Sequence, residues 1–98
     1  MRDLLPFMNE QGQLVALPAK HKKRLKAYYF LATKLESGKQ YTESELNDLL
    51  NQWAVFGDPA TLRRELYNKY LLNRTNDCGQ YWREERLPSL EEFIAKYV

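Results

Sequence analysis

The stretch that decides the fold reads DPATLRRELYNKY, residues 58–70. Asp58 before Pro59 is the order of a helix N-cap followed by proline at the first helical position. Large apolar residues then recur every four positions, a spacing that indicates the buried side of a helix. They are Leu62, Leu66 and Tyr70. A helix is therefore predicted here, with its remaining side chains facing solvent.

Two short runs of strand type follow this helix. They read LLNR at residues 71–74 and QYWR at residues 80–83, and they flank the polar sequence NDCG at residues 76–79. Extended runs joined by a polar loop that ends in glycine are typical of a hairpin. The pattern predicts a β-hairpin directly after the helix.

Two more helices and a brief strand are predicted upstream. Thr42 and Glu45 form a capping box before an apolar helical stripe. That stripe is Leu46, Leu49, Leu50 and Trp53. An earlier stripe at spacings of three and four predicts a first helix from about Ala19 to Glu36, which Ser37-Gly38 ends. Its members are Leu25, Tyr28, Tyr29, Ala32 and Leu35. Gln40-Tyr41, between these two helices, is predicted to form the brief strand.

Both ends of the chain carry structural signals. The apolar runs Phe7-Met8 and Gln13-Leu14-Val15 flank Asn9-Glu10-Gln11-Gly12, which suits a tight turn, so an N-terminal hairpin is predicted. Near the other end, Ser89 and Glu92 form a second capping box in front of an amphipathic helix. Its apolar face is Leu90, Phe93, Ile94 and Tyr97.

The order helix, strand, helix, helix, hairpin predicts an α+β fold of the winged helix-turn-helix type. We expect an N-terminal β-hairpin, a three-helix core, a C-terminal β-wing and an additional C-terminal helix. A chain of 98 residues has room for one ordinary core, so residues 1–98 are expected to form a single domain. Its core would span about residues 7–83, and an amphipathic extension about residues 87–98. The hydrophobic fraction of 44% argues against disorder.

The formal net charge is only +2, but the charges come in alternating blocks. Residues 19–40 hold seven bases and one acid, residues 41–62 hold four acids and no base, and residues 63–76 hold four bases and one acid. Two basic segments that meet on one side of a fold would form a footprint for a polyanion.

The residues also resemble a known family. One part of the pattern is Pro18, Lys20, Lys22, Lys23, Arg24 and Leu25, followed by Tyr41-Thr42-Glu43, Leu46-Asn47 and Leu50. The most specific part is Asp58, Ala60-Thr61-Leu62-Arg63-Arg64-Glu65-Leu66, Leu72, Arg74, Gly79 and Tyr81-Trp82. From Phe7 to Arg83 the chain resembles the bacterial domain of unknown function 2087, which occurs alone or joined to ArsR-type repressors. The resemblance implies a winged-helix-like domain with a regulatory role. Residues 87–98 depart from the family pattern.

Double-stranded DNA is the expected partner. Burying one side of the third helix turns outward residue types that read bases or grip phosphates. The predicted contacts of this helix and the wing are Thr61, Arg63, Arg64, Asn68, Lys69 and Arg74. A second set of cations, at the start of the first helix, is predicted to bind phosphate, and it comprises Lys20, Lys22, Lys23 and Arg24.

Each of these predictions has a structural alternative. Either Arg63 or Arg64 could pair with Asp58, Glu65 or a neighbouring helix and so hold the domain together. The lysine run could be a solvated face. Most aromatic residues are assigned to the core, and Tyr67 and Tyr81 are left as candidates for exposed roles.

The DNA-binding protein is expected to act as a dimer through its terminal helices. The alternative function is a winged-helix module that binds protein rather than DNA through Leu90, Phe93, Ile94 and Tyr97. No enzyme is predicted, because no phosphate loop, acid-base pair or activated nucleophile is visible. Cys78 is the only cysteine and His21 the only histidine, so neither a metal site nor a cofactor is expected. With neither a signal peptide nor a membrane span in the pattern, a cytoplasmic location is expected.

Overall fold

Helix α3, Pro59–Asn68, forms where the sequence predicts it in the computed structural model, which describes residues 2–98. The Asp58 carboxylate accepts a hydrogen bond from the backbone N–H of Thr61 at 3.4 Å, and Pro59 opens the helix. Leu62 and Leu66 are fully buried beneath it. Both the N-cap and the buried side predicted from these leucines are confirmed.

The prediction that Tyr70 continues this buried side is wrong. The helix ends at Asn68, and Tyr70 adopts the left-handed backbone conformation with a φ of 60°. The backbone N–H of Leu71 then donates to the carbonyl of Leu66 at 3.0 Å, which closes the helix end. Tyr70 is left 67% exposed. A four-residue spacing places a side chain on the buried face only while the helix continues.

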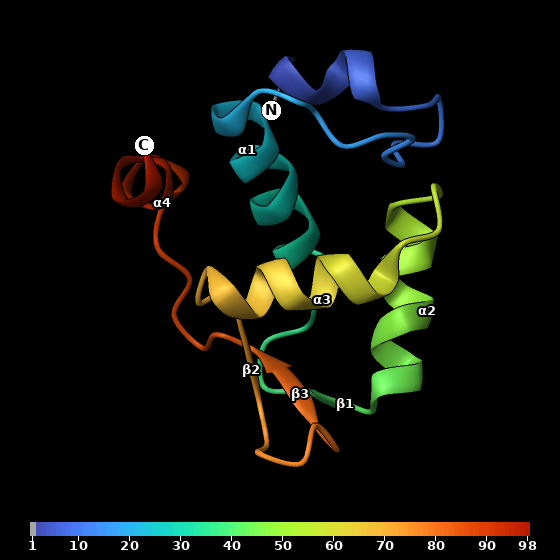
Figure 1. Cartoon of the computed structure of the whole chain (residues 1–98), viewed down its shortest axis with the longest axis vertical. Helices are drawn as coiled ribbons and strands as arrows, with labels where there is room; N and C mark the ends of the chain where they lie inside the picture. Colours follow the sequence, from blue (N-terminus) through green and yellow to red (C-terminus); the bar gives the residue numbers. More distant parts are fainter. Residues whose placement is uncertain (1) are drawn as a thin grey trace.

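Three other α-helices and a 3-10 helix complete the helical part. They are the 3-10 helix η1, Arg2–Phe7, and the α-helices α1, His21–Ala32, α2, Glu43–Trp53, and α4, Leu90–Tyr97. The capping boxes predicted at Thr42 and Ser89 are both present. Helix α1 is shorter than predicted at both ends, and Leu35 is buried from the turn that follows it. Figure 1 shows α3 crossing in front of α1, with α2 and α4 on either side.

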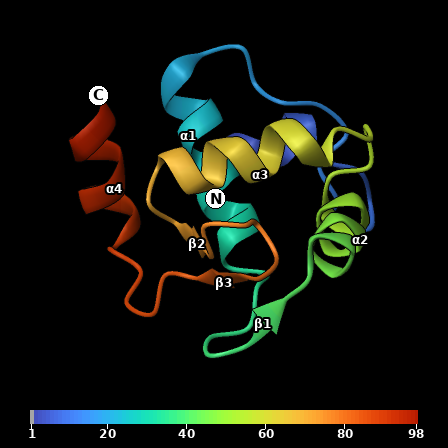
Figure 2. The ribbon, with the colours of Figure 1, turned by 60° about the horizontal axis from the view of Figure 1, so that its bottom comes forward.

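Three short strands form one antiparallel sheet. They are β1, Gln40–Tyr41, β2, Leu72–Arg74, and β3, Tyr81–Arg83. The order across the sheet is β1-β3-β2, with Tyr41 opposite Tyr81 and Asn73 opposite Trp82. The predicted brief strand and the predicted hairpin are therefore confirmed, and Figure 2 shows the loop of this hairpin beside α3.

The predicted N-terminal hairpin is not formed. Its turn exists, since the backbone N–H of Asn9 donates to the carbonyl of Gln13 at 2.9 Å, but only the single bridge Met8–Leu14 joins the two arms. Phe7 belongs to η1, and the N–H of Leu14 instead donates to the carbonyl of Trp53 at 2.8 Å. Pairing with the end of α2 thus replaces the second strand.

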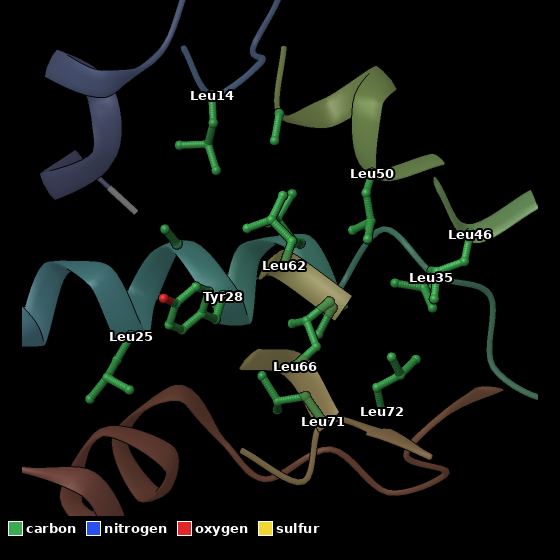
Figure 3. Packing of buried hydrophobic residues seen from close by; sticks show 14 of the residues in the cluster. Leu14, Leu25, Tyr28, Leu35, Leu46, Leu50, Leu62, Leu66, Leu71 and Leu72 are labelled. Atoms are coloured by element: carbon green, nitrogen blue, oxygen red, sulfur yellow. The ribbon is translucent and has the colours of Figure 1, made fainter. Parts of the chain in front are cut away.

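Leucines dominate the interior. Figure 3 shows side chains from α1, α2, α3 and β2 converging, among them Leu25, Leu50, Leu62 and Leu72. Truncating such a residue to alanine costs about 2–5 kcal/mol, because it removes buried surface and leaves a cavity. This α+β core holds α3 and the hairpin in fixed positions. Within residues 2–98, no helix has the length and apolar character that a membrane span requires.

Candidate nucleic-acid interface

A hollow of about 280 Å³ lies between α3 and the β2–β3 hairpin. Its charged lining consists of the three arginines Arg63, Arg64 and Arg74, and no carboxylate side chain lines it. The other lining residues are Ala60, Tyr67, Asn68, Cys78 and Tyr81. We call this site the arginine hollow. It brings together four of the residues predicted from the sequence to bind DNA, namely Arg63, Arg64, Asn68 and Arg74.

Arg63 fastens α3 to α2. Its Nη2 lies 3.0 Å from the Glu43 carboxylate, and its Nη1 donates to the amide oxygen of Asn47. Only 17% of its side chain is exposed. The structural alternative, a pair with a neighbouring helix, therefore describes Arg63, although part of its side chain still lines the hollow.

Arg64 differs from Arg63 in its exposure and in its polar contacts. It is exposed, and across residues 2–98 it has neither an ion pair nor a side-chain hydrogen bond. Asn68 follows it by one helical turn and is also exposed. Together these two residues mark the solvent-facing ridge of α3, and one edge of this ridge borders the arginine hollow.

Arg74, the last residue of β2, faces this ridge from the hairpin. Its guanidinium lies 4.4 Å from the centre of the Tyr67 ring, and its Nη1 donates to the Cys78 sulfur at 3.1 Å and to the carbonyl of Thr75 at 3.3 Å. Stacking on an aromatic face holds a guanidinium plane without neutralising its charge. Arg74 is thus a fixed and positively charged wall of the hollow.

Tyr81 and Cys78 also line the hollow and were not predicted as part of the DNA-binding site. Tyr81 was a candidate for an exposed role, but it is only 5% exposed and belongs to the core, with its side chain reaching the hollow. Burial is the main reason that the pKa of its hydroxyl is raised above the usual value of 10.0, and the neighbouring Cys78 adds to the effect. The phenol therefore stays protonated at neutral pH and can donate a hydrogen bond.

The hairpin loop that carries Cys78 is held by its own polar groups. The Thr75 hydroxyl donates to the Asp77 carboxylate at 2.7 Å, and the backbone N–H of Gly79 donates to the same carboxylate at 2.9 Å. These two hydrogen bonds, the first being the larger cause, lower the pKa of Asp77. They fix the loop in which Cys78 adopts a left-handed conformation with a φ of 60°.

A second hollow, of about 180 Å³, lies on the other flank of the α3 ridge, where α3 meets the start of α1. Thr61 and Lys69 line it from α3, and His21 and Arg24 line it from α1. The Nε of Arg24 donates to the Tyr28 hydroxyl at 3.0 Å, and Lys69 pairs with Glu65 at 3.3 Å. Three more of the predicted residues, Thr61, Lys69 and Arg24, therefore lie beside the same helix.

The lysines of α1 do not join this group as one patch. Lys22 and Lys26 line a different hollow, beside α4, and Lys26 pairs with Asp3. Lys23 is half-buried and lies close enough to Asp3 to help lower the pKa of that carboxyl. Lys20 is exposed at the N-cap position of α1. The predicted phosphate-binding run is therefore divided among several directions, and only Arg24 is shown to border the α3 ridge.

The apolar face of α4 packs inward. Phe93 is 2% exposed and Ile94 is 8% exposed, and the Phe93 ring lies 5.7 Å from that of Tyr29 and 5.2 Å from that of Tyr97. Leu90 and Tyr97 are half-buried against the same core. The four residues predicted as a possible interaction face thus pack α4 against the core, and Leu90 and Ile94 also line a hollow beside α4.

No group of three or more potential metal ligands is found in the part of the chain that the structure describes. Residues 13–83, more than two-thirds of the chain, match the family described as "Uncharacterized protein conserved in bacteria (DUF2087)". The chain, an α+β domain, therefore belongs to the DUF2087 family, as the resemblance in the sequence predicted. No curated protein and no solved structure matches the chain.

Proposed function

We propose that this chain is a winged-helix DNA-binding domain with the role of a transcription regulator and without enzymatic activity. The order α1-β1-α2-α3-β2-β3, with β3 between β1 and β2, supports the winged-helix assignment. In that type of domain the third helix enters the major groove and the hairpin reaches the adjacent backbone. α3 would be the recognition helix, and the β2–β3 hairpin the wing.

The observation that carries this proposal is the arginine hollow. Three arginines and an asparagine converge where the helix meets the hairpin, and no acidic side chain lines the hollow between them. A helix seated in a groove places the adjacent phosphate backbone next to such a junction. The hollow therefore supports an interface in which α3 reads bases while the hairpin holds the backbone.

The residues take different roles in this interface. Arg64 and Asn68, on the exposed ridge, have the side chains that form paired hydrogen bonds with guanine and adenine. Arg74, fixed against Tyr67, would grip a phosphate. On the far flank, Arg24, Thr61 and Lys69 would contact the opposite strand. Arg63 would act mainly by positioning α3, because Glu43 already balances its charge.

The alternative, a protein-binding module, receives less support. It was based on the apolar face of α4, and Phe93 and Ile94 of that face are buried in the core of the domain itself. We therefore retain DNA binding as the proposal.

The test is fluorescence anisotropy with labelled duplex DNA over a series of salt concentrations. Binding should weaken steeply with salt, because binding releases counterions from the DNA and the free energy gained by their release falls as the salt concentration rises. Arg64→Ala should lower the affinity about tenfold, as expected for a lost bidentate contact. Arg86→Ala is the matched control, since Arg86 is also exposed but lies in the connection between β3 and α4. Absence of binding at low salt, or equal losses in both variants, would refute the proposal.

A further inference from the structure

Two arginines of the arginine hollow carry a positive charge that no carboxylate in the described part of the chain balances. Arg63 is neutralised by Glu43, but no carboxylate oxygen within residues 2–98 lies within 4.0 Å of a side-chain nitrogen of Arg64 or Arg74. Two uncompensated guanidinium groups therefore border one small space. The two hollows beside α4 differ, because Glu91 lines one and Glu84 and Glu92 line the other.

The side chain of Tyr81 forms the inner side of this space. Tyr81 is only 5% exposed, yet its side chain lines the hollow. The nearest polar neighbours are Cys78, whose sulfur already accepts from Arg74, and Arg63, whose nitrogens already bind Glu43 and Asn47. Because both neighbours are already engaged, the phenol hydroxyl can donate to an anionic oxygen that enters the hollow.

The hairpin side of the site is also held in place before any ligand binds. Arg74 is held on three sides, by the Tyr67 ring, the Cys78 sulfur and the Thr75 carbonyl. The loop behind it is tied by the bonds between Thr75, Asp77 and Gly79. An anion that binds there does not have to order the side chain of Arg74, so less of the interaction energy of this arginine is lost on binding.

We propose that the arginine hollow binds a phosphate group, with Arg64 and Arg74 as its charged donors and the Tyr81 hydroxyl as its inner donor. Guanidinium groups match the geometry of phosphate oxygens, and two of them balance a doubly charged phosphate. At about 280 Å³, the hollow is at the small end of ligand sites, so it suits a phosphate with a small part of its parent compound. That parent is either the DNA backbone, in which case the inference rests on the proposed function, or a free phosphorylated metabolite.

The first experiment titrates inorganic phosphate and pyrophosphate into the full chain, with sodium chloride adjusted to keep the ionic strength constant. Backbone amide resonances of Asn68, Arg74 and Cys78 should shift along saturable curves in ¹H–¹⁵N spectra. Tyr81→Phe, which removes only the hydroxyl, and Arg74→Lys, which keeps the charge but loses the fork, should each weaken phosphate binding about tenfold. Arg86→Ala should bind phosphate like the natural chain. Thermal unfolding checks that each variant is folded.

The second experiment measures duplex DNA binding by the same variants and its competition by pyrophosphate. Joint loss of phosphate and DNA affinity in Tyr81→Phe and Arg74→Lys, together with competition, would identify the DNA backbone as the source of the phosphate. Loss of phosphate binding alone would identify a free phosphorylated compound instead.

The two proposals fail in different ways. DNA binding that depends on Arg64 without saturable phosphate binding would overturn the phosphate site and leave the proposed function standing. Phosphate binding in a chain that does not bind DNA would overturn the proposed function and leave the phosphate site standing. Equal phosphate affinity in the natural chain, Tyr81→Phe and Arg74→Lys would also overturn the site.

Discussion

The guanidinium of Arg74 lies 4.4 Å above the centre of the Tyr67 ring, which joins the β2–β3 hairpin to the exposed side of α3. Tyr67 is 39% exposed, so the contact is made at the surface rather than in the core. Its main effect is to orient Arg74 over the arginine hollow.

Replacing this ring should therefore affect binding more than stability. Tyr67→Ala frees Arg74 to move, and we expect duplex affinity to fall severalfold, with a loss of only about 0.5–1 kcal/mol in the free energy of unfolding. Tyr67→Phe keeps an aromatic face and should bind almost as the natural chain does. Anisotropy titrations and thermal unfolding measure the two effects. Equal binding by the alanine and phenylalanine variants would show that the stacking does not position Arg74.

Arg63 and Arg64 are adjacent, yet replacing the first should mainly lower stability and replacing the second should mainly lower DNA affinity. Arg63→Ala removes the contacts with Glu43 and Asn47 and should lower the free energy of unfolding by about 1–2 kcal/mol. Arg64→Ala removes an exposed side chain without a partner, and its stability should change by less than about 0.5 kcal/mol while DNA affinity falls. Denaturant unfolding of both variants checks the first effect. A stability loss in Arg64→Ala equal to that in Arg63→Ala would contradict the division.

The different roles of Arg63 and Arg64 show where sequence-based prediction stops. The outward side of α3 follows from the local spacing of Leu62 and Leu66, and the caps follow from signals within four residues of each other. Whether Arg63 meets Glu43 depends on where α2 lies, which no local pattern encodes. The sequence predicted the three arginines and Asn68 of the hollow, but not that Cys78 and Tyr81 would line it. Those two reach it only because the hairpin folds back toward α3.

The missing N-terminal hairpin has the same cause. The turn between Asn9 and Gly12 was correctly predicted, because asparagine and glycine favour it locally. The backbone of Leu14, however, forms hydrogen bonds with Trp53 and Val55, which are distant in sequence. Local propensity could not anticipate that competitor, and neither could it show that the helical spacing ends before Tyr70.

Cys78 provides a chemical probe of the arginine hollow. Its half-buried sulfur lines the hollow and accepts a hydrogen bond from Arg74. Alkylation with iodoacetate would place a carboxylate among the arginines, whereas iodoacetamide adds a neutral group of similar size. We expect the anionic adduct to reduce DNA and phosphate binding more than the neutral adduct, because it supplies its own counter-charge.

Binding before and after each reagent, with mass spectrometry to confirm the adduct, measures this effect. Cys78→Ser should be insensitive to both reagents and serves as the control. Identical losses from the charged and neutral adducts would indicate steric blocking alone and would count against electrostatic attraction in the hollow.

Stability at low pH should depend on Asp77. The hydrogen bonds from Thr75 and Gly79 lower its pKa below the ordinary 3.8, so folding favours the ionised carboxylate. This contribution is fully present above the ordinary pKa and is lost as the pH falls through the lowered pKa of the folded state. Asp77→Asn lacks the titration, so its deficit in melting temperature should shrink as the pH is lowered below about 4. A deficit that stays constant from neutral to acidic pH would show that this carboxylate does not contribute to the loss of stability at low pH.

Replacing Tyr70 with glycine should raise stability once its contact with Lys96 has been removed. Its left-handed backbone, with a φ of 60°, closes α3 at a position where glycine has no Cβ to strain, and its side chain is 67% exposed. The relief of strain is worth about 1 kcal/mol, whereas the exposed contact of the Lys96 ammonium, 4.7 Å from the ring centre, contributes about 0.5–1 kcal/mol. Strain and contact are therefore close in size, and we expect Tyr70→Gly in a Lys96→Ala background, where the contact is already lost, to raise the melting temperature. Asparagine, which tolerates the same conformation, should give a smaller gain. A lower melting temperature for Tyr70→Gly in that background would show that the tyrosine is held by contacts other than Lys96, and that these outweigh the strain of its backbone.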